Sequence, residues 1–426
     1  MQHDGVVDDS EAVPRLQPQP CQVDQLPFDR GSSVVGRQPV DCVADDCDPC
    51  ARPGQPDQLL RVLPQPERGE VEPHPVIVPP GVREDAGMKV LVAPDRFGVE
   101  LAAAEAADAV ALGWARSAPY DELDLLPLSD GGPGFLDVLH SALGGEIGVV
   151  TVRGPLGGQV PARLLRVADT AYVEAAEAVG LHLVDPGRRD PVGASSYGVG
   201  ELLVAAAASG AGRVVVGVGG TATTDGGRGL IEAVDGHRDD LTDVALVAAT
   251  ATDAPLMGHS GAAHGFAAGK GADRAAREQL ETALREWATQ TDGGLAVRPG
   301  AGAGGGIGFG LLLLGAERVN GTALVTEATG LDQRVRAADL AVTALGVFDW
   351  ESLRGRVVVG VTRAAQQAGR PTVVLADRVD VGRRELSSAG VDAAYAADDV
   401  PMGDELHGAA DRLAVLAARV ARTWSR

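Results

Sequence analysis

Two glycine-rich turns each hold one aspartate shortly after an apolar run. The first is LPLSDGGPG (126–134) with Asp130, and the second is VVVGVGGTATTDGGRG (214–229) with Asp225. Glycine lacks a Cβ atom, so phosphate oxygens can approach the backbone N–H groups of such turns. A carboxylate repels phosphate unless a cation lies between them or the carboxylate acts as a base. Together the two acids indicate Mg²⁺ binding and activation of a hydroxyl group, although each DGG alone is typical of a plain turn.

Lys270 stands out because the chain has two lysines, Lys89 and Lys270, among 37 lysine and arginine residues. It lies between two glycines in GFAAGKG (265–271), where a compact ammonium group can reach a phosphate. The segment is not a Walker P-loop, because three residues rather than four precede the GK pair and Gly271 follows it. Chance retention of one lysine is the alternative interpretation.

A third glycine-rich stretch, PGAGAGGGIGFG (299–310), matches the dinucleotide fingerprint only weakly. Ile307 falls where the last glycine or alanine of G-x-G-x-x-G belongs. A nucleotide-binding loop at the start of a helix and close packing of that helix are equally good interpretations.

Strands and helices must position these turns, and the sequence alternates the two from Met88 onward. Apolar runs at 89–94 and 123–128 predict buried strands, and helical spacing of apolar residues predicts helices at 100–116 and 134–143. This βαβα order predicts an α/β fold with a parallel sheet between helices. Ligands of such sheets bind outside the carboxyl ends of the strands, and both DGG turns follow a predicted strand.

The doubly wound pattern is interrupted and then returns, which predicts two domains. Residues 151–297 contain short mixed segments typical of an inserted α/β domain, and the first pattern recurs after 298. We therefore expect a discontinuous doubly wound domain formed by 88–150 and 298–426, with a cleft between it and the inserted domain.

Residues 1–87 differ in composition from the remainder. They contain 14 of the 26 prolines and no lysine, which is typical of a disordered extension or of a segment upstream of the true start at Met88. All four cysteines lie there, so the remainder has no disulfide framework. Three of them, Cys42, Cys47 and Cys50, have metal-like spacing but lack a fourth cysteine or a paired histidine, so a metal site is not expected.

Charge and hydropathy exclude several classes of function. The formal net charge of −22 argues against binding to nucleic acid, which requires basic surfaces. Hydrophobic residues make up 45% and aromatic residues 3%, so alanine, valine and leucine must build the core. The sequence contains neither a run of about 20 apolar residues nor a signal peptide pattern. We therefore expect a cytoplasmic protein that does not bind membranes.

Six segments, in order, resemble motifs of the type I glycerate kinase family. They are KVLVAPDRFG (89–98), LPLSDGGPG, VRGPLGGQV (152–160), the stretch 195–227, GAAHGFAAGKGA (261–272) and PGAGAGGGIGFGLL (299–312). The similarity covers nearly all of residues 88–385.

The resemblance implies a flavodoxin-like domain with an inserted α/β domain, and an enzyme that uses ATP and Mg²⁺ to phosphorylate D-glycerate. Its partner would be this small molecule, and a homodimer is compatible with the family. Asp130 and Asp225 would serve as Mg²⁺ ligands or as the base, and Lys270 would neutralise phosphate. The residues implied to bind substrate or nucleotide are Asp95, Arg96, Gly131, Gly132, Gly219, Gly220, Thr221, Thr223, Gly226, Gly227, Gly269, Asp349 and Ser352.

Several charged residues of the family motifs are replaced. Gly98 and Arg356 stand where the family has lysines, Leu345 where it has a glutamate, and Ala251 where it has an aspartate. Loss of one such group can cost about 3 kcal/mol of transition-state stabilisation. The alternative hypothesis is therefore a weak or inactive homologue that binds a nucleotide or a small hydroxy acid for regulation.

Overall fold

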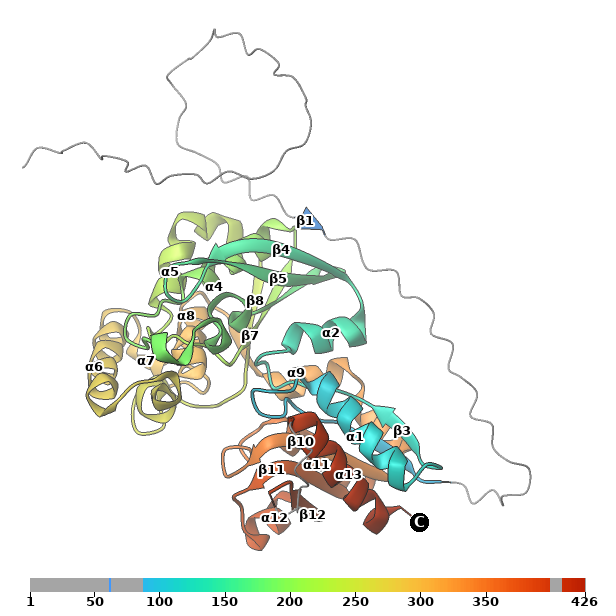
Figure 1. Ribbon diagram of the computed structural model, residues 1–426. Helices are drawn as coiled ribbons and strands as arrows, with labels where there is room; N and C mark the ends of the chain where they lie inside the picture. Colours follow the sequence, from blue (N-terminus) through green and yellow to red (C-terminus); the bar gives the residue numbers. More distant parts are fainter. Residues whose placement is uncertain (1–60, 63–86, 399–407, 426) are drawn as a thin grey trace, which may run out of the picture. The chain divides into compact units, whose positions relative to one another are not determined.

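The computed structural model of the chain describes residues 61–62, 87–398 and 408–425 (Figure 1). All of these residues belong to one compact unit. The expectations for the N-terminal extension and its four cysteines concern residues outside the described ranges.

A five-stranded parallel sheet carries the first DGG turn. Its spatial order is β3-β2-β10-β11-β12, which is 2-1-3-4-5 in chain order and is the flavodoxin-like arrangement. The α/β class predicted from the sequence, with a doubly wound sheet, is confirmed. The strands are β2 (Lys89–Val92), β3 (Glu122–Leu125), β10 (Leu340–Phe348), β11 (Thr372–Val379) and β12 (Ala393–Ala396).

Helices cover both faces of this sheet, which explains why its inner strands β2, β10 and β11 contain continuous apolar runs. Helices α1 (Ala103–Ser117) and α13 (Ala409–Trp424) share a core cluster with one face. Helices α9 (Gly321–Ala328), α10 (Leu331–Ala337) and α11 (Val357–Ala368) pack against the other. Helix α12 (Arg383–Ala389) joins β11 to β12.

A seven-stranded mixed sheet carries the second DGG turn. Its order is β1-β4-β5-β6-β7-β8-β9, in which the strands from β6 to β9 are parallel and the remaining pairs antiparallel. The strands are β1 (Arg61–Val62), β4 (Glu146–Arg153), β5 (Gln159–Val167), β6 (Thr170–Glu174), β7 (Arg213–Val218), β8 (Ala245–Thr250) and β9 (Glu317–Asn320). The associated helices are α2 (Phe135–Leu143), α3 (Ala175–Val179), α4 (Tyr197–Ala208), α5 (Arg228–Val234), α6 (Arg274–Gln290), α7 (Gly293–Ala296) and α8 (Ile307–Leu313).

One apolar cluster joins the two sheets. It contains Leu91 of β2, Val215 of β7 and Val247 of β8, together with Phe135 and Leu136 of α2. All five side chains are almost completely buried. The two sheets therefore share part of their core and are not independent layers.

The chain returns to the five-stranded sheet later than the sequence pattern indicates. Strand β9 pairs with β8, and Ile307 and Leu311 of α8 lie in the same core cluster as Val214 and Val216 of β7. The stretch from 298 to 320 thus packs with the seven-stranded sheet, and β4 begins before residue 151. The division into two domains stays a prediction.

The predicted elements around the first turn are present, with shorter ends. The helix expected from residue 100 begins at Ala103, because the Glu105 carboxylate accepts the N–H of Ala102 (2.8 Å) and caps the first turn. The strand expected at 123–128 ends at Leu125, two residues before Pro127. Local signals therefore place these elements to within about three residues.

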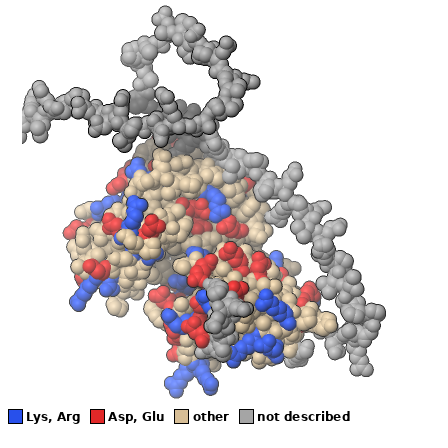
Figure 2. All heavy atoms as spheres, in the orientation of Figure 1, with Lys and Arg blue, Asp and Glu red and all other residues tan. Residues whose placement is uncertain are grey.

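Within the described ranges, no helix is long and apolar enough to cross a membrane. On the face shown in Figure 2, arginine and lysine side chains are interspersed with aspartates and glutamates.

The close packing of α1 on α13 can be tested at Gly113. A Cβ atom added there would overlap the backbone carbonyl of Ala414, and this clash outweighs the gain of about 1 kcal/mol in helix propensity. We expect Gly113→Ala to lower the free energy of unfolding by about 1–3 kcal/mol in urea denaturation followed by circular dichroism. Gly187→Ala is the control, because a Cβ atom there has no neighbour within 4 Å. Equal stability of the two variants would contradict this packing.

Candidate functional site

The two DGG turns meet although they belong to different sheets. The first follows β3 and the second follows β7, both at carboxyl ends of parallel strands. A Cβ atom placed on Gly219 would lie 2.7 Å from the Cα atom of Gly132, and one on Gly220 would overlap the Pro133 ring. Glycine is therefore required at 219 because two backbones touch there.

Asp130 is buried, and its two oxygens differ in surroundings. Its Oδ1 accepts the N–H of Gly132 (3.0 Å), while the Ser129 hydroxyl accepts the N–H of Gly131 (3.2 Å). Its Oδ2 lies 3.7 Å from Nη1 of Arg356, an ion pair too long to be a hydrogen bond. One carboxylate oxygen is thus fixed by the turn, and the other faces a cation.

Asp95 lies near Asp130 at the end of β2. Its own N–H donates to the carbonyl of Ala344 in β10 (2.9 Å), and its Oδ1 accepts the N–H of Arg96 (2.7 Å). Burial, and then the charge of Asp130, raise the pKa of Asp95 to about 7, against the opposing influences of the hydrogen bond from the Arg96 N–H and of the charge of Arg356. Two carboxylates and one guanidinium therefore gather at the ends of β2 and β3.

Asp225 holds the starts of two helices. Its Oδ2 accepts hydrogen bonds from the N–H (2.8 Å) and hydroxyl (2.7 Å) of Ser196, just before α4, and from the N–H of Gly229 in α5 (3.1 Å). Its Oδ1 accepts the N–H of Gly227 (3.1 Å), and the Ser196 hydroxyl accepts the N–H of Leu230 (3.0 Å). Because four donors converge on one carboxylate, Asp225 fixes α4 and α5 to the turn.

Lys270 is buried beneath the second turn. Its Nζ donates to the carbonyl of Thr223 (2.6 Å) and to the hydroxyl of Thr221 (3.3 Å). Burial lowers the pKa of Lys270 to about 8, although the nearby charge of Asp225 acts to raise it. The ammonium group therefore supports the turn from within the protein.

The third glycine-rich stretch packs directly on the second turn. The N–H of Gly226 donates to the carbonyl of Gly305 (3.0 Å), and a Cβ atom on Gly227 would lie 2.8 Å from the Cα atom of Gly310 in α8. Of the two interpretations left open by the sequence, close packing of a helix is the one that these contacts support. The N–H groups of Gly226 and Gly227 are occupied within the protein.

The remaining predicted residues fall into two groups. Asp349 and Ser352 form a local turn after β10, in which the Ser352 N–H donates to Asp349 Oδ1 (3.0 Å), and Arg96 donates to the Val99 carbonyl (3.2 Å). On the side of the seven-stranded sheet, Gly269 is exposed and precedes the buried Lys270. The first group therefore lies on loops that follow strands of the five-stranded sheet, and the second lies next to Lys270.

Two residues that hold the site together were not predicted from the sequence. Glu174, at the end of β6, accepts the N–H groups of Gly134 (3.1 Å) and Leu136 (3.3 Å) and so fixes the start of α2. Burial, followed by the charge of Glu177, raises its pKa to about 8. The available signal was a pair of acids, Glu174 and Glu177, in the otherwise apolar run AYVEAAEAV. Ser196 is the other, and its signal was a polar residue before the apolar run that forms α4. Arg356 was noted from the sequence only as the replacement of a family lysine.

The oxygen donors of the site determine whether it could bind Mg²⁺. In the part of the chain that the structure describes, no three histidine, cysteine, aspartate or glutamate side chains are placed to enclose a metal ion. Mg²⁺ commonly takes only one or two carboxylates and completes its shell with phosphate oxygens and water. Asp130 fits this requirement, because its Oδ2 accepts no hydrogen bond from the described residues. Asp225 stays a predicted ligand, with oxygens that already accept four hydrogen bonds.

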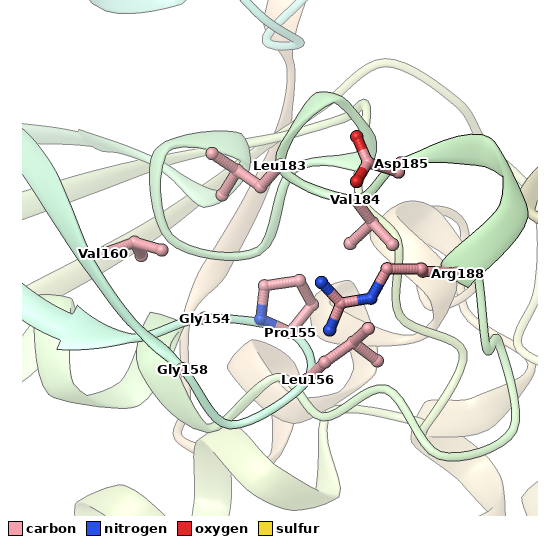
Figure 3. Close-up of a pocket in the computed structure, with 9 residues that line it drawn as sticks. All are labelled: Gly154, Pro155, Leu156, Gly158, Val160, Leu183, Val184, Asp185 and Arg188. Carbon is pink, nitrogen blue, oxygen red and sulfur yellow. The ribbon is translucent and has the colours of Figure 1, made fainter. Parts of the chain in front are cut away.

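A cavity of about 200 Å³ lies beside the GPLGG loop between β4 and β5 (Figure 3). Pro155 and Leu156 form one wall, Leu183 and Val184 another, and Arg188 points into the space. The residues that line it are different from those predicted for the site, so the cavity is a separate feature of the seven-stranded sheet.

The role of Ser196 as a link can be measured by stability. Ser196→Ala removes a donor to Asp225 and leaves the Leu230 N–H without its acceptor, so we expect the free energy of unfolding to fall by about 1–3 kcal/mol. Ser209→Ala is the matched control at the other end of α4, where the hydroxyl contacts only the Ala206 carbonyl. Urea denaturation compares the two, and an equal loss in both would contradict the linking role.

The buried charge of Lys270 predicts a pH dependence of stability. Its pKa is about 8 in the folded chain and near 10.5 when unfolded. The unfolded chain binds more protons between these values, so the free energy of unfolding rises with pH through this window. Lys270→Met removes that contribution, so the wild type should gain up to about 3 kcal/mol relative to the variant between pH 8 and 10.5. Lys89→Met, which changes an exposed lysine paired with Glu122, should show a constant difference from the wild type. A constant difference for Lys270→Met would contradict the burial of its charge.

Comparisons with known proteins show which family the chain belongs to. The sequence profile of the glycerate kinase family matches residues 90–240 and 234–425. An uncharacterized protein of Mycobacterium bovis is 43% identical, over 80% of this chain and 93% of that protein. Glycerate kinase of Halalkalibacterium halodurans is 35% identical, over 79% of this chain and 99% of that protein.

A crystal structure from Salmonella typhimurium LT2, provisionally assigned as glycerate kinase 2, has a TM-score of 0.61 and 30% identity. The alignment covers 79% of this chain and 96% of that one. The family profile spans nearly all of the described residues, and these relatives match over most of their own length. The chain therefore belongs to the glycerate kinase family.

Proposed function

We propose that the chain is an ATP-dependent glycerate kinase that transfers the γ-phosphoryl group of ATP to a hydroxyl of D-glycerate. The observation that carries this proposal is the contact between the turns of Asp130 and Gly219. It brings the carboxyl ends of strands from two sheets together, which is where α/β proteins bind phosphorylated ligands. Membership of the family supports the choice of substrate class.

In this reaction the hydroxyl oxygen forms a bond to the γ-phosphorus while the bond from that phosphorus to the ADP oxygen breaks. The hydroxyl proton leaves to a carboxylate, for which Asp130 and Asp225 are the proposed acceptors. When bound, ATP would supply the phosphoryl group, and Mg²⁺ would offset the negative charge of the phosphates. Asp130 would hold the metal through its Oδ2.

The other residues of the chain would position these groups. Lys270 holds the turn at 221–223 through the Thr223 carbonyl, and Asp225 fixes the starts of α4 and α5. Such positioning is the main contribution of a protein to phosphoryl transfer, because the chemistry itself needs little covalent participation. We further propose that this reaction takes place in the cytoplasm. A homodimer stays a prediction from the family.

The test uses the full chain with Mg²⁺, ATP and D-glycerate, and measures ADP and phosphoglycerate. We expect Asp130→Asn to lower kcat by about 100-fold or more, because the variant loses the carboxylate proposed to hold Mg²⁺ and to accept the hydroxyl proton. Asp124→Asn is the control. Asp124 lies on β3 and forms an exposed ion pair with Arg334 of α10, so this variant should retain activity.

Two other outcomes are informative. Asp225→Asn should lower both activity and stability, because the carboxylate accepts four hydrogen bonds. If the wild type forms no ADP with D-glycerate but its melting temperature rises with nucleotide, the chain is a binding homologue and the proposed activity is wrong.

A further inference from the structure

Arg356 lies among carboxylates from three different loops. Its Nη1 is 3.7 Å from Oδ2 of Asp130, after β3, and its Nη2 is 3.8 Å from Oε2 of Glu351, after β10. It also lowers the pKa of Asp95, after β2. Burial acts to lower the pKa of Arg356, but Asp130, Asp95 and the neighbouring acids outweigh it and raise the pKa.

The guanidinium group of Arg356 is surrounded by acids but is not hydrogen-bonded to them. Both of its ion-pair distances exceed the usual hydrogen-bond range, and it donates no side-chain hydrogen bond to the described residues. Structural arginines of this chain behave differently. Arg412 donates to both oxygens of Asp377 (3.0 and 3.1 Å), and Arg163 donates to Asp137 and Glu177. Arg356 therefore keeps its fork of N–H donors available, while its side chain is 39% exposed.

The position of Arg356 in the fold is that of a ligand-binding residue. Strands β2 and β10 are neighbours, but the chain leads from β2 to β3 on one side and from β10 to β11 on the other. This is the topological switch point, where doubly wound sheets bind ligands. The loop after β2 crosses the end of β10 here, because a Cβ atom on Gly346 would lie 2.6 Å from the N atom of Gly98.

A guanidinium group matches the oxygens of a phosphate in a bidentate manner. We infer that Arg356 binds the terminal phosphate of the nucleotide, the group that is transferred, at the switch point between β2 and β10. This inference rests on the proposed function. In the free chain, Arg356 offsets the charges of Asp130, Asp95 and Glu351. With Mg²⁺ held by Asp130, the guanidinium group of Arg356 would be free to donate to phosphate oxygens.

The experiment compares nucleotides that differ only in the terminal phosphate. Isothermal titration of the full chain with Mg²⁺ and either ADP or the β,γ-imido analogue of ATP is carried out for the wild type and for Arg356→Met. We expect the variant to bind the analogue about tenfold or more weakly, while its affinity for ADP changes by less than about twofold. Its kcat should fall about 100-fold, with little change in the KM for glycerate.

Two further variants sharpen the test. Arg354→Met is the matched control in the same loop, because Arg354 stacks on Trp350 (4.4 Å to the ring centroid). It should bind both nucleotides as the wild type does. Arg356→Lys keeps the charge but not the planar fork, so it should recover part of the affinity for the analogue and only part of kcat.

Unchanged binding of the analogue by Arg356→Met would overturn the inference. Equal weakening for ADP and the analogue, together with a lower melting temperature, would also overturn it, because it would show a structural role only. If the wild type binds the analogue but does not phosphorylate glycerate, only the proposed function fails, and the comparison of the variants still decides the role of Arg356. A wild type that binds neither nucleotide overturns both.

Discussion

The contact between Gly132 and Gly219 is the constraint on which the candidate site depends. Each glycine lies in a turn that follows a strand of a different sheet, and a side chain at 219 would push the two backbones apart. Around this point the protein fixes each turn with its own polar anchor. Glu174 holds the segment after the first turn, and Asp225 and Lys270 hold the second. Glu174 and Lys270 are buried and Asp225 is half-buried, so each turn is held by hydrogen bonds formed within the protein.

The polar groups of the site are therefore of two kinds. Some form hydrogen bonds within the protein, and others have donors or acceptors that could bind a ligand. Asp225 and Lys270 belong to the first kind, since their hydrogen bonds end on the backbone and side chains nearby. Asp130 and Arg356 belong to the second, because they face each other at a distance that satisfies charge but not hydrogen bonding. Asp130 is a buried charge without a close cationic partner, which is costly, and the part-exposed Arg356 can be reached from solvent, so this pair is a natural place for a ligand.

Much of the fold could be predicted from the sequence, because it depends on local patterns. Buried runs such as that of β2 and the glycine turns after β3 and β7 were found by periodicity and composition, and so was the α/β class. The placement of residues 298–320 could not be predicted, because the apolar face of α8 fits either sheet until its partners are known. The sequence also could not show that Gly226 and Gly227 serve close packing rather than phosphate binding. Their positive φ angles and close neighbours come from tertiary packing, which leaves the same letters in a sequence as a phosphate-binding loop.

The apolar cluster shared by the two sheets links their unfolding. An inserted domain can usually be removed, because the domain that surrounds it has a complete hydrophobic core of its own. Here the removal of the seven-stranded sheet would expose the face of α2 that carries Phe135 and Leu136, together with Leu91 of β2. Neither sheet therefore has a complete core of its own. The two sheets should unfold cooperatively, because the unfolding of either sheet would expose apolar side chains of the other to water.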